Sequence, residues 1–212
     1  MQRIAVVDYG MGNLRSVAKA LEHVAPGAHV CVTAEAHEIE SADRVVFPGQ
    51  GAMRDCMREL DSRQLRAAIE KAAKDKPFLG ICIGQQLLFT HSEEGDTPGL
   101  NILPGEVCRF AHDAVGADGL RLKVPHMGWS QVRPTHEHPL WANIPADSRF
   151  YYVHSYYVVP ADPNLVAATT DYPLPFAGAV ARDSLFAVQF HPEKSADVGL
   201  QLLKNFVTWS GA

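Results

Sequence analysis

A short run near the middle of the chain, Gly80-Ile81-Cys82-Ile83-Gly84, places one cysteine between two glycines. Apolar residues precede this run at 77–79 and follow it at 87–89. The pattern Gly-x-Cys-x-Gly is typical of a nucleophile elbow, in which a strand turns sharply into a helix. Positions beside so tight a turn must lack side chains if the strand and the helix are to pack closely. We therefore predict a strand ending at Cys82, a sharp turn, and a helix that continues through 87–89.

Such a turn would give Cys82 a chemical role. The turn lifts the sulfur out of the sheet and sets it at the N-terminus of a helix, where the partial positive charge favours the nucleophilic thiolate. The alternative is a structural cysteine in an ordinary turn, because free cysteine is among the most buried residue types. The motif alone leaves both interpretations open.

Length and composition favour one α/β domain over residues 1–212. Hydrophobic residues at 47% and charged residues at 20% are ordinary for a soluble globular protein, and the net charge of -5 disfavours nucleic acid as a partner. No apolar run is long enough to span a bilayer, and Asp8 comes too early for a signal peptide. The four cysteines are far apart, which predicts neither a zinc site nor a disulfide framework. We expect a cytoplasmic protein.

The N-terminal half has the pattern of a parallel sheet. Apolar runs at 4–8, 28–32 and 44–47 read as buried strands. Helical spacing of apolar residues predicts helices at 14–24, 53–60 and 62–74, the last with Ser62 as its N-cap. Residues 91–99 are polar and rich in glycine, so we expect a surface loop there, with Glu93 and Glu94 forming a solvated patch.

Two glycine-rich loops follow predicted strands. The first, residues 9–13, has Gly10 and Gly12 but lacks the third glycine of a dinucleotide site, so it is a tight turn or a loop facing a substrate or partner. The second, residues 48–53, contains Gly49-Gln50-Gly51 at the carboxyl edge of the sheet, where ligands bind. Its amide N–H groups could stabilise an oxyanion, and an ordinary turn is the alternative.

In the C-terminal half, the spacing of apolar residues changes to an alternation with polar ones. Residues 106–110 and 120–124 alternate apolar and polar side chains, which predicts antiparallel strands joined by a turn at 113–119. Further strands are predicted at 166–170 and 176–181, and a loop at 125–129. Residues 149–159 read as one aromatic-rich strand with His154 and Ser155 in its middle. The predicted fold class is α/β: a mostly parallel central sheet with helices on both faces and an added antiparallel strand region in the C-terminal half.

The last predicted strand, residues 185–190, ends at His191-Pro192-Glu193, and a closing helix is predicted at 195–209. Pro192 keeps His191 out of helical backbone angles, and a carboxylate two residues away can orient an imidazole ring. Cys82, His191 and Glu193 therefore form a candidate nucleophilic triad. In such a triad the histidine takes the thiol proton and later protonates the leaving group, while the cysteine attacks a carbonyl and forms a thioester that water hydrolyses.

The run at 80–86 together with His191-Pro192-Glu193 resembles the class I (triad) glutamine amidotransferases. Within that family, three further stretches resemble the glutaminase subunits of imidazole glycerol phosphate synthase. They are residues 8–16, Pro48-Gly49-Gln50-Gly51-Ala52-Met53 and Pro125-His126-Met127-Gly128-Trp129. The resemblance covers essentially the whole chain.

The resemblance implies that Cys82 hydrolyses glutamine to glutamate and ammonia, with no cofactor and no metal. Gly49, Gln50 and Gly51 would form the oxyanion strand. The family often has an aliphatic residue at the position of Gln50, but the backbone amide carries the role, so we expect little effect. The residues that would contact glutamine are Gln86, His154, Ser155 and Tyr156.

The resemblance also implies a partner. The faces carrying Asn13, Met127, Gly128 and Trp129 would meet a cyclase subunit, which is a (β/α)8 barrel. That barrel would use the ammonia to make imidazole glycerol phosphate and an aminoimidazole carboxamide ribotide in histidine biosynthesis. The alternatives are another ammonia-donating glutaminase, a free-standing thiol hydrolase acting on esters or peptides, and a non-catalytic regulatory subunit.

Overall fold

The computed structural model describes residues 1–111, 115, 121 and 123–211. Its centre is an eight-stranded sheet with the strand order β2-β1-β3-β4-β14-β13-β12-β9. In chain order these strands are β1 (Arg3–Val7), β2 (His29–Thr33), β3 (Arg44–Gly49), β4 (Phe78–Cys82), β9 (Arg133–Pro134), β12 (Val166–Asp171), β13 (Pro175–Arg182) and β14 (Leu185–Val188). Neighbouring strands from β2 to β14 are parallel, and those from β14 to β9 are antiparallel.

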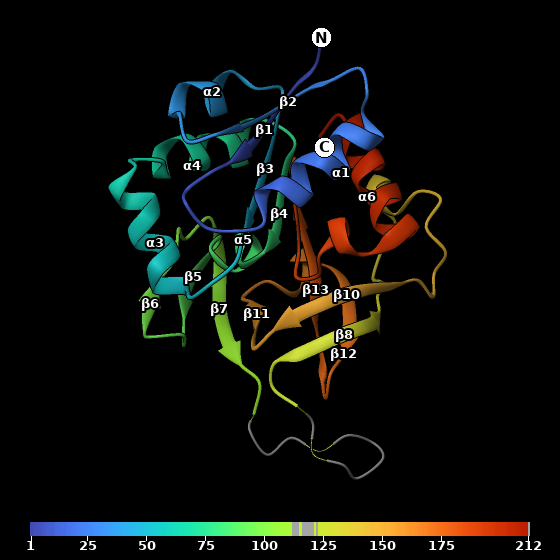
Figure 1. Cartoon of the computed structure of the whole chain (residues 1–212). Helices are drawn as coiled ribbons and strands as arrows, with labels where there is room; N and C mark the ends of the chain where they lie inside the picture. The colour runs from blue at the N-terminus through green and yellow to red at the C-terminus, as the bar shows by residue number, and fades with distance from the viewer. Residues whose placement is uncertain (112–114, 116–120, 122, 212) are drawn as a thin grey trace.

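Helices cover both faces of this sheet (Figure 1). Successive side chains of a strand point to opposite faces, so each buried strand serves two cores. On β1, Ile4 and Val6 pack with α1 (Leu14–Val24) and α6 (Ala196–Thr208). Ala5 and Val7 pack on the other face with α2 (Ala36–Ser41), α3 (Met53–Ser62) and α4 (Arg66–Asp75). The predicted fold class is confirmed.

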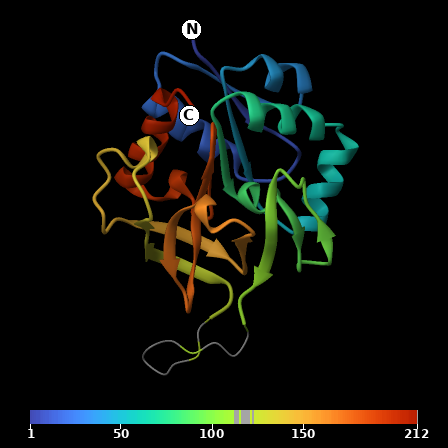
Figure 2. The same cartoon turned by 180° about the vertical axis from the view of Figure 1, so that it is seen from behind.

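Two smaller sheets occupy the lower half of the molecule in Figures 1 and 2, and the β5–β6 edge of one of them lies beside α3. One pairs β10 (Arg149–His154) with β8 (His126–Gln131). The other has the order β11-β7-β5-β6, formed by β11 (Tyr156–Pro160), β7 (Leu103–Arg109), β5 (Phe89–Ser92) and β6 (Thr97–Pro98). Short 3-10 helices lie at Pro139–Trp141, Pro163–Leu165 and Pro192–Lys194.

The predicted N-cap at Ser62 is wrong. Helix α3 runs through Ser62, whose hydroxyl donates a hydrogen bond to the carbonyl of Glu59 within the same helix. The next helix begins only after Leu65, its N-cap residue. A serine that satisfies its hydroxyl on the preceding turn cannot cap the following helix, so the local sequence preference is overridden.

Two predicted loops lie partly in strands. Residues 91–99 contain a turn at 93–96, but the residues on both sides of it pair as β5 and β6 in a hairpin, in which Ser92 and Thr97 are buried. The predicted loop at 125–129 lies largely in β8, which pairs with β10 along its whole length. The single strand predicted at 149–159 is two strands in different sheets, separated at Ser155. These pairings join residues distant in the sequence, so local patterns do not reveal them.

The predicted turn at 113–119 and strand at 120–124 include positions outside the described residues. None of the helices within the described ranges is long and apolar enough to cross a membrane.

Candidate active site

Cys82 is the last residue of β4 and stands at the turn into α5 (Ile83–Gln86). Its backbone has φ 56° and ψ -114°, outside the regions that most L-residues occupy. Gly84 makes this turn possible, because a Cβ at that position would lie 1.9 Å from the carbonyl oxygen of Phe47 on β3. The predicted strand and sharp turn are present. The helix has only a single turn and does not continue through 87–89, since Phe89 already starts β5.

His191 and Glu193 reach the same place from the neighbouring strand. Strand β14 runs parallel to β4, with Val188 opposite Ile81, so the residues after both strands meet at the carboxyl edge of the sheet. His191 Nδ1 and Glu193 Oε1 lie 2.8 Å apart, and the two side chains are only 8% and 2% exposed. The hydroxyl of Ser195 donates to the backbone carbonyl of His191 over 2.6 Å and holds this segment in place.

The charges around His191 favour its protonated form. Burial lowers its pKa, but the Cys82 thiolate and then the Glu193 carboxylate raise it by more, so that the pKa of His191 rises from 6.5 to about 10. Glu193 holds Nδ1, and Nε2 has no hydrogen-bond partner among the described residues. Nε2 is therefore the ring nitrogen that can pass a proton to a leaving group.

The loop with Gly49, Gln50 and Gly51 lies beside the nucleophile. Gly49 is the last residue of β3 and stands opposite Cys82 in the sheet. A Cβ at Gly49 would lie 1.8 Å from the hydroxyl oxygen of Tyr9, so this ring packs directly under the loop. The carbonyl of Gln50 accepts a hydrogen bond from the buried thiol of Cys56 on α3, with 3.6 Å between sulfur and oxygen.

A cavity of about 330 Å³ opens over Cys82 and His191. A volume of this order suits a small-molecule ligand. Predicted residues that line it are Gln50, Gly51, Cys82, Gln86, His154, Ser155, Tyr156 and His191. The structure thus brings together residues from four regions of the chain, of which the substrate contacts were predicted only by resemblance.

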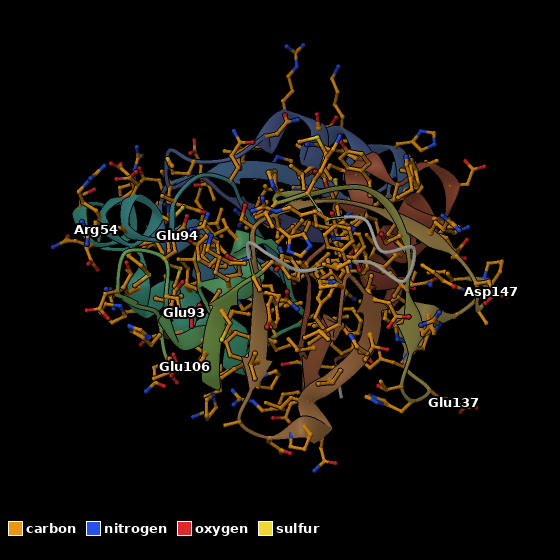
Figure 3. All side chains as sticks on the ribbon, turned by 90° about the horizontal axis from the view of Figure 1, so that it is seen from below. Arg54, Glu93, Glu94, Glu106, Glu137 and Asp147 are labelled. Atoms are coloured by element: carbon orange, nitrogen blue, oxygen red, sulfur yellow. The ribbon has the colours of Figure 1, made fainter. Side chains whose placement is uncertain are left out.

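Glu94 belongs to the site, although its sequence context predicts a solvated patch. Glu94 lines the cavity, and its carboxylate accepts a hydrogen bond from the backbone N–H of Met53 over 2.8 Å. Its neighbour Glu93 accepts one from the backbone N–H of Arg109 over 2.6 Å. Figure 3 shows both glutamates on the same side of the molecule, with Glu94 nearer to Arg54 of α3. Lys194, next to the triad glutamate, also lines the cavity and was not predicted.

The residues predicted to meet a partner are exposed. Met127 is 61% and Trp129 is 47% exposed, and both stand on β8, where Gly128 lies between them with φ +141°. The Trp129 ring contacts the Tyr151 ring edge-to-face at 6.0 Å between centroids. Asn13 is exposed at the start of α1. Large apolar side chains left in the open on a paired strand are typical of an interaction surface.

Within the part of the chain that the structure describes, no three His, Cys, Asp or Glu side chains lie close enough together to hold a metal ion. The elbow cysteine and the buried histidine–glutamate pair are the groups that thiol-dependent hydrolysis requires, and they lie at the edge of a parallel sheet covered on both faces. The family model of the class-I glutamine amidotransferases matches residues 5–209, and the chain belongs to this family.

Two relatives of this chain share one name. The chain is 64% identical over 212 residues to the imidazole glycerol phosphate synthase subunit HisH of Aromatoleum aromaticum, covering 99% of this chain and 100% of the relative. It is 64% identical over 208 residues to the same subunit of Thiobacillus denitrificans, covering 98% and 91%. The structure of PurLQS from Thermotoga maritima has a TM-score of 0.71 at 18% identity, covering 97% of this chain and 97% of that chain, which shows a shared fold.

Proposed function

We propose that this chain is the glutaminase subunit of an imidazole glycerol phosphate synthase, acting in the cytoplasm as one class I glutamine amidotransferase domain over residues 1–212. It hydrolyses L-glutamine to glutamate and ammonia and passes the ammonia to a cyclase subunit. The observation that carries the glutaminase activity is the placement of Cys82 on a strained elbow beside the buried His191–Glu193 pair. The assignment to this synthase is supported by the relatives that are 64% identical over nearly the whole chain.

The reaction follows from this geometry. The Cys82 thiolate attacks the side-chain amide carbon of glutamine, and a tetrahedral intermediate forms. Donors in the Gly49–Gly51 loop and the elbow hold its oxyanion. His191, kept protonated by the two anions next to it, gives the Nε2 proton to the departing nitrogen, so ammonia leaves and a thioester remains. His191 then takes a proton from water, whose oxygen attacks the thioester and releases glutamate.

Recognition of the substrate would involve both ends of glutamine. Gln86, His154, Ser155 and Tyr156 line the cavity next to the nucleophile and are assigned to substrate contacts. We add Glu94, because a carboxylate fixed by the Met53 amide suits the α-ammonium group of an amino acid.

The partner in this proposal is a cyclase of the (β/α)8 barrel type, joined as a heterodimer. Met127, Gly128 and Trp129 on β8, together with Asn13, form the proposed docking face. The exposure of Met127 and Trp129 supports this assignment. In the cyclase, the ammonia contributes to imidazole glycerol phosphate and an aminoimidazole carboxamide ribotide.

Glutamate release from glutamine tests the proposal. The purified chain is assayed alone, with a cyclase subunit, and with the cyclase and its nucleotide substrate, and Cys82→Ala serves as the inactive control. We expect low release by the free chain and strong stimulation in the complete mixture. Hydrolysis without stimulation would remove the cyclase from the proposal, and no hydrolysis in any mixture would refute the glutaminase itself.

A further inference from the structure

A line of buried polar side chains connects β8 to the nucleophile. Its first half consists of two histidines. The hydroxyl oxygen of Ser130 lies 2.8 Å from His126 Nε2, and His126 Nδ1 lies 2.9 Å from His154 Nε2. His154 Nδ1 lies 2.7 Å from the backbone carbonyl oxygen of Tyr156. Both imidazoles are buried, with 2% and 6% of the residue exposed.

Two glutamines continue the line to the sulfur. The side-chain amide of Gln86 donates to the same Tyr156 carbonyl over 3.1 Å and to Oε1 of Gln189 over 2.9 Å. Gln189 in turn donates from Nε2 to the Cys82 sulfur over 3.7 Å, a distance suited to a sulfur acceptor. Gln189 is fully buried, and no step of the proposed reaction uses it.

The chemistry of the groups gives each half of this line a direction of its own, and both halves donate to the Tyr156 carbonyl. Burial lowers the pKa of His126 to about 4 and that of His154 to about 3, so each ring is neutral at pH 7 and carries one N–H. The Tyr156 carbonyl can only accept, so His154 carries its proton on Nδ1, and its Nε2 must accept from His126 Nδ1. His126 Nε2 then accepts from the Ser130 hydroxyl.

The same reasoning orients the glutamines. The Gln86 nitrogen faces the carbonyl oxygen of Tyr156, which leaves only an oxygen of Gln189 to accept its second N–H. The Gln189 nitrogen is thereby turned toward Cys82. Reversing any one amide would set two donors or two acceptors against each other in a buried place, which is costly.

The first histidine is also held by packing. The His126 ring stacks on Tyr172 at 3.9 Å and on Tyr152 at 4.9 Å between ring centroids, with interplanar angles of 16° and 23°. A ring stacked in this way cannot rotate to present its other nitrogen without moving both neighbours.

We infer that Gln189 is a positioning residue for the Cys82 nucleophile. Its amide is kept in the donating orientation by Gln86, which donates to the Tyr156 carbonyl, and the chain of hydrogen bonds that begins at Ser130 on β8 holds this carbonyl in place. The inference deepens the proposed function and rests on it for the role of Cys82. Because Ser130 directly follows Trp129 on the exposed strand, a shift of β8 on docking would reach the thiol through this chain.

Alkylation of Cys82 tests the first part without glutamine or a partner. The full-length chain is treated with iodoacetamide from pH 5 to pH 10, and modification of Cys82 is followed by peptide mass spectrometry. Gln189→Met removes the donor, and Gln189→Glu replaces it with a carboxylate. We expect the pH midpoint of Cys82 alkylation to rise by about one unit in the first variant and further in the second, because a hydrogen bond to the thiolate is lost.

An unchanged midpoint in both folded variants would overturn the positioning role. Folding of both variants is checked by circular dichroism. A loss of packing alone would not raise the alkylation midpoint more in Gln189→Glu than in Gln189→Met, so this order is specific to the lost hydrogen bond. Alkylation of Cys82 needs no substrate, so a shift in its pH midpoint would support the positioning role even if no glutamate release were detected. Failure of the glutaminase proposal and failure of the positioning role can therefore be told apart.

The second part is tested at the far end of the chain. Ser130→Ala removes the first donor, and its matched control is Ser148→Ala, which removes a hydroxyl that donates to the Pro145 carbonyl over 2.6 Å, outside this chain of hydrogen bonds. We expect Ser130→Ala to slow Cys82 alkylation at pH 7 by about 2- to 10-fold, and the control to leave the rate unchanged. The variant with both Ser130→Ala and Gln189→Met should be no slower than Gln189→Met alone.

If the two substitutions slow Cys82 alkylation additively in the double variant, or if Ser130→Ala and Ser148→Ala are alkylated at equal rates, the hydrogen bonds from Ser130 do not act through Gln189. If a variant does not fold, nitrogen NMR of the parent chain measures the tautomers of the two imidazoles directly. Both His126 and His154 should be neutral Nδ1–H tautomers at pH 7. An Nε2–H tautomer or an imidazolium at either position would overturn the direction of the chain.

Discussion

The carboxylate of Glu94 accepts the backbone N–H of Met53 over 2.8 Å, although the two residues are 41 positions apart in the chain. This contact ties the β5–β6 hairpin to the first turn of α3, where an acidic group is also favoured by the helix dipole. It fixes a negative charge at the wall of the cavity that contains Cys82. A site for an amino acid needs such a charge, because the α-ammonium group must be paired when it leaves water.

We expect Glu94→Gln to raise the KM for glutamine by about 10- to 100-fold, since a hydrogen bond between charged groups is lost, while kcat changes much less. Steady-state glutamate release measures both constants. Glu93→Gln is the matched control, because Glu93 accepts from the Arg109 amide and does not line the cavity. Equal KM values for the two variants would contradict the role of Glu94.

Replacing the nucleophile should separate catalysis from assembly. Cys82→Ala is expected to abolish glutamate release and to leave binding of the cyclase subunit intact, because β8 and the Met127–Trp129 surface are untouched. Calorimetry of the complex and the glutamate assay measure the two properties. Activity that survives in this variant would place the nucleophile elsewhere.

The elbow itself can be tested through stability. Gly84→Ala would place a Cβ 1.9 Å from the Phe47 carbonyl oxygen, which belongs to a central strand and cannot move away. We expect a loss of about 3 kcal/mol in the free energy of unfolding. Gly27→Ala is the control, because a Cβ at Gly27 meets nothing within 4 Å, and it should change stability by less than about 0.5 kcal/mol. Urea denaturation measures the free energy of unfolding of both variants. Similar losses in the two would show that the close approach of Gly84 to Phe47 does not require glycine.

One half-buried histidine, His138, predicts how stability responds to acid. Burial lowers the pKa of His138 from 6.5 to about 4, and its Nδ1 accepts the backbone N–H of Leu140 over 3.1 Å. Below pH 6.5 the unfolded chain binds a proton here that the folded chain does not, so the free energy of unfolding falls as the pH drops from 6.5 to about 4.

His138→Asn keeps an acceptor for Leu140 but removes the titrating group. The decrease in unfolding free energy between pH 7 and pH 5 should therefore be smaller than in the parent chain by about 1 to 2 kcal/mol. Urea denaturation at pH 7 and at pH 5 provides the comparison. The packing energy lost with the ring is the same at both pH values, so it cancels in the difference. The same decrease in parent and variant would mean that His138 is protonated in the folded state.

Local sequence patterns were sufficient for the parallel half of the sheet and for the chemistry. Cys82, His191 and Glu193 each stand in a motif of a few residues at a strand end. Parallel neighbours bring such ends to one edge of a sheet, so these motifs were enough to predict a candidate triad, whereas the pairing of β4 with β14 came from the structure. The strands and helices of the first half also carry their own periodicity.

The strand pairings and contacts between residues far apart in the sequence could be seen only in the folded structure. The β5–β6 hairpin, the pairing of β8 with β10 and the break at Ser155 depend on which strands meet, and the local period does not record this. Glu94 reads as a solvated residue until the amide of Met53 lies beside it.

The polar chain to the nucleophile shows the same division. Gln189 lies 107 positions from the sulfur that it contacts, and His126 lies 28 positions from His154. Residue type and strand position were enough to identify the side chains that can carry the reaction, because nucleophile, base and acid are properties of the residues themselves. The orientation of these groups follows from the folded structure, because a hydrogen bond needs donor and acceptor at contact distance, and burial then leaves each group a single way to satisfy it.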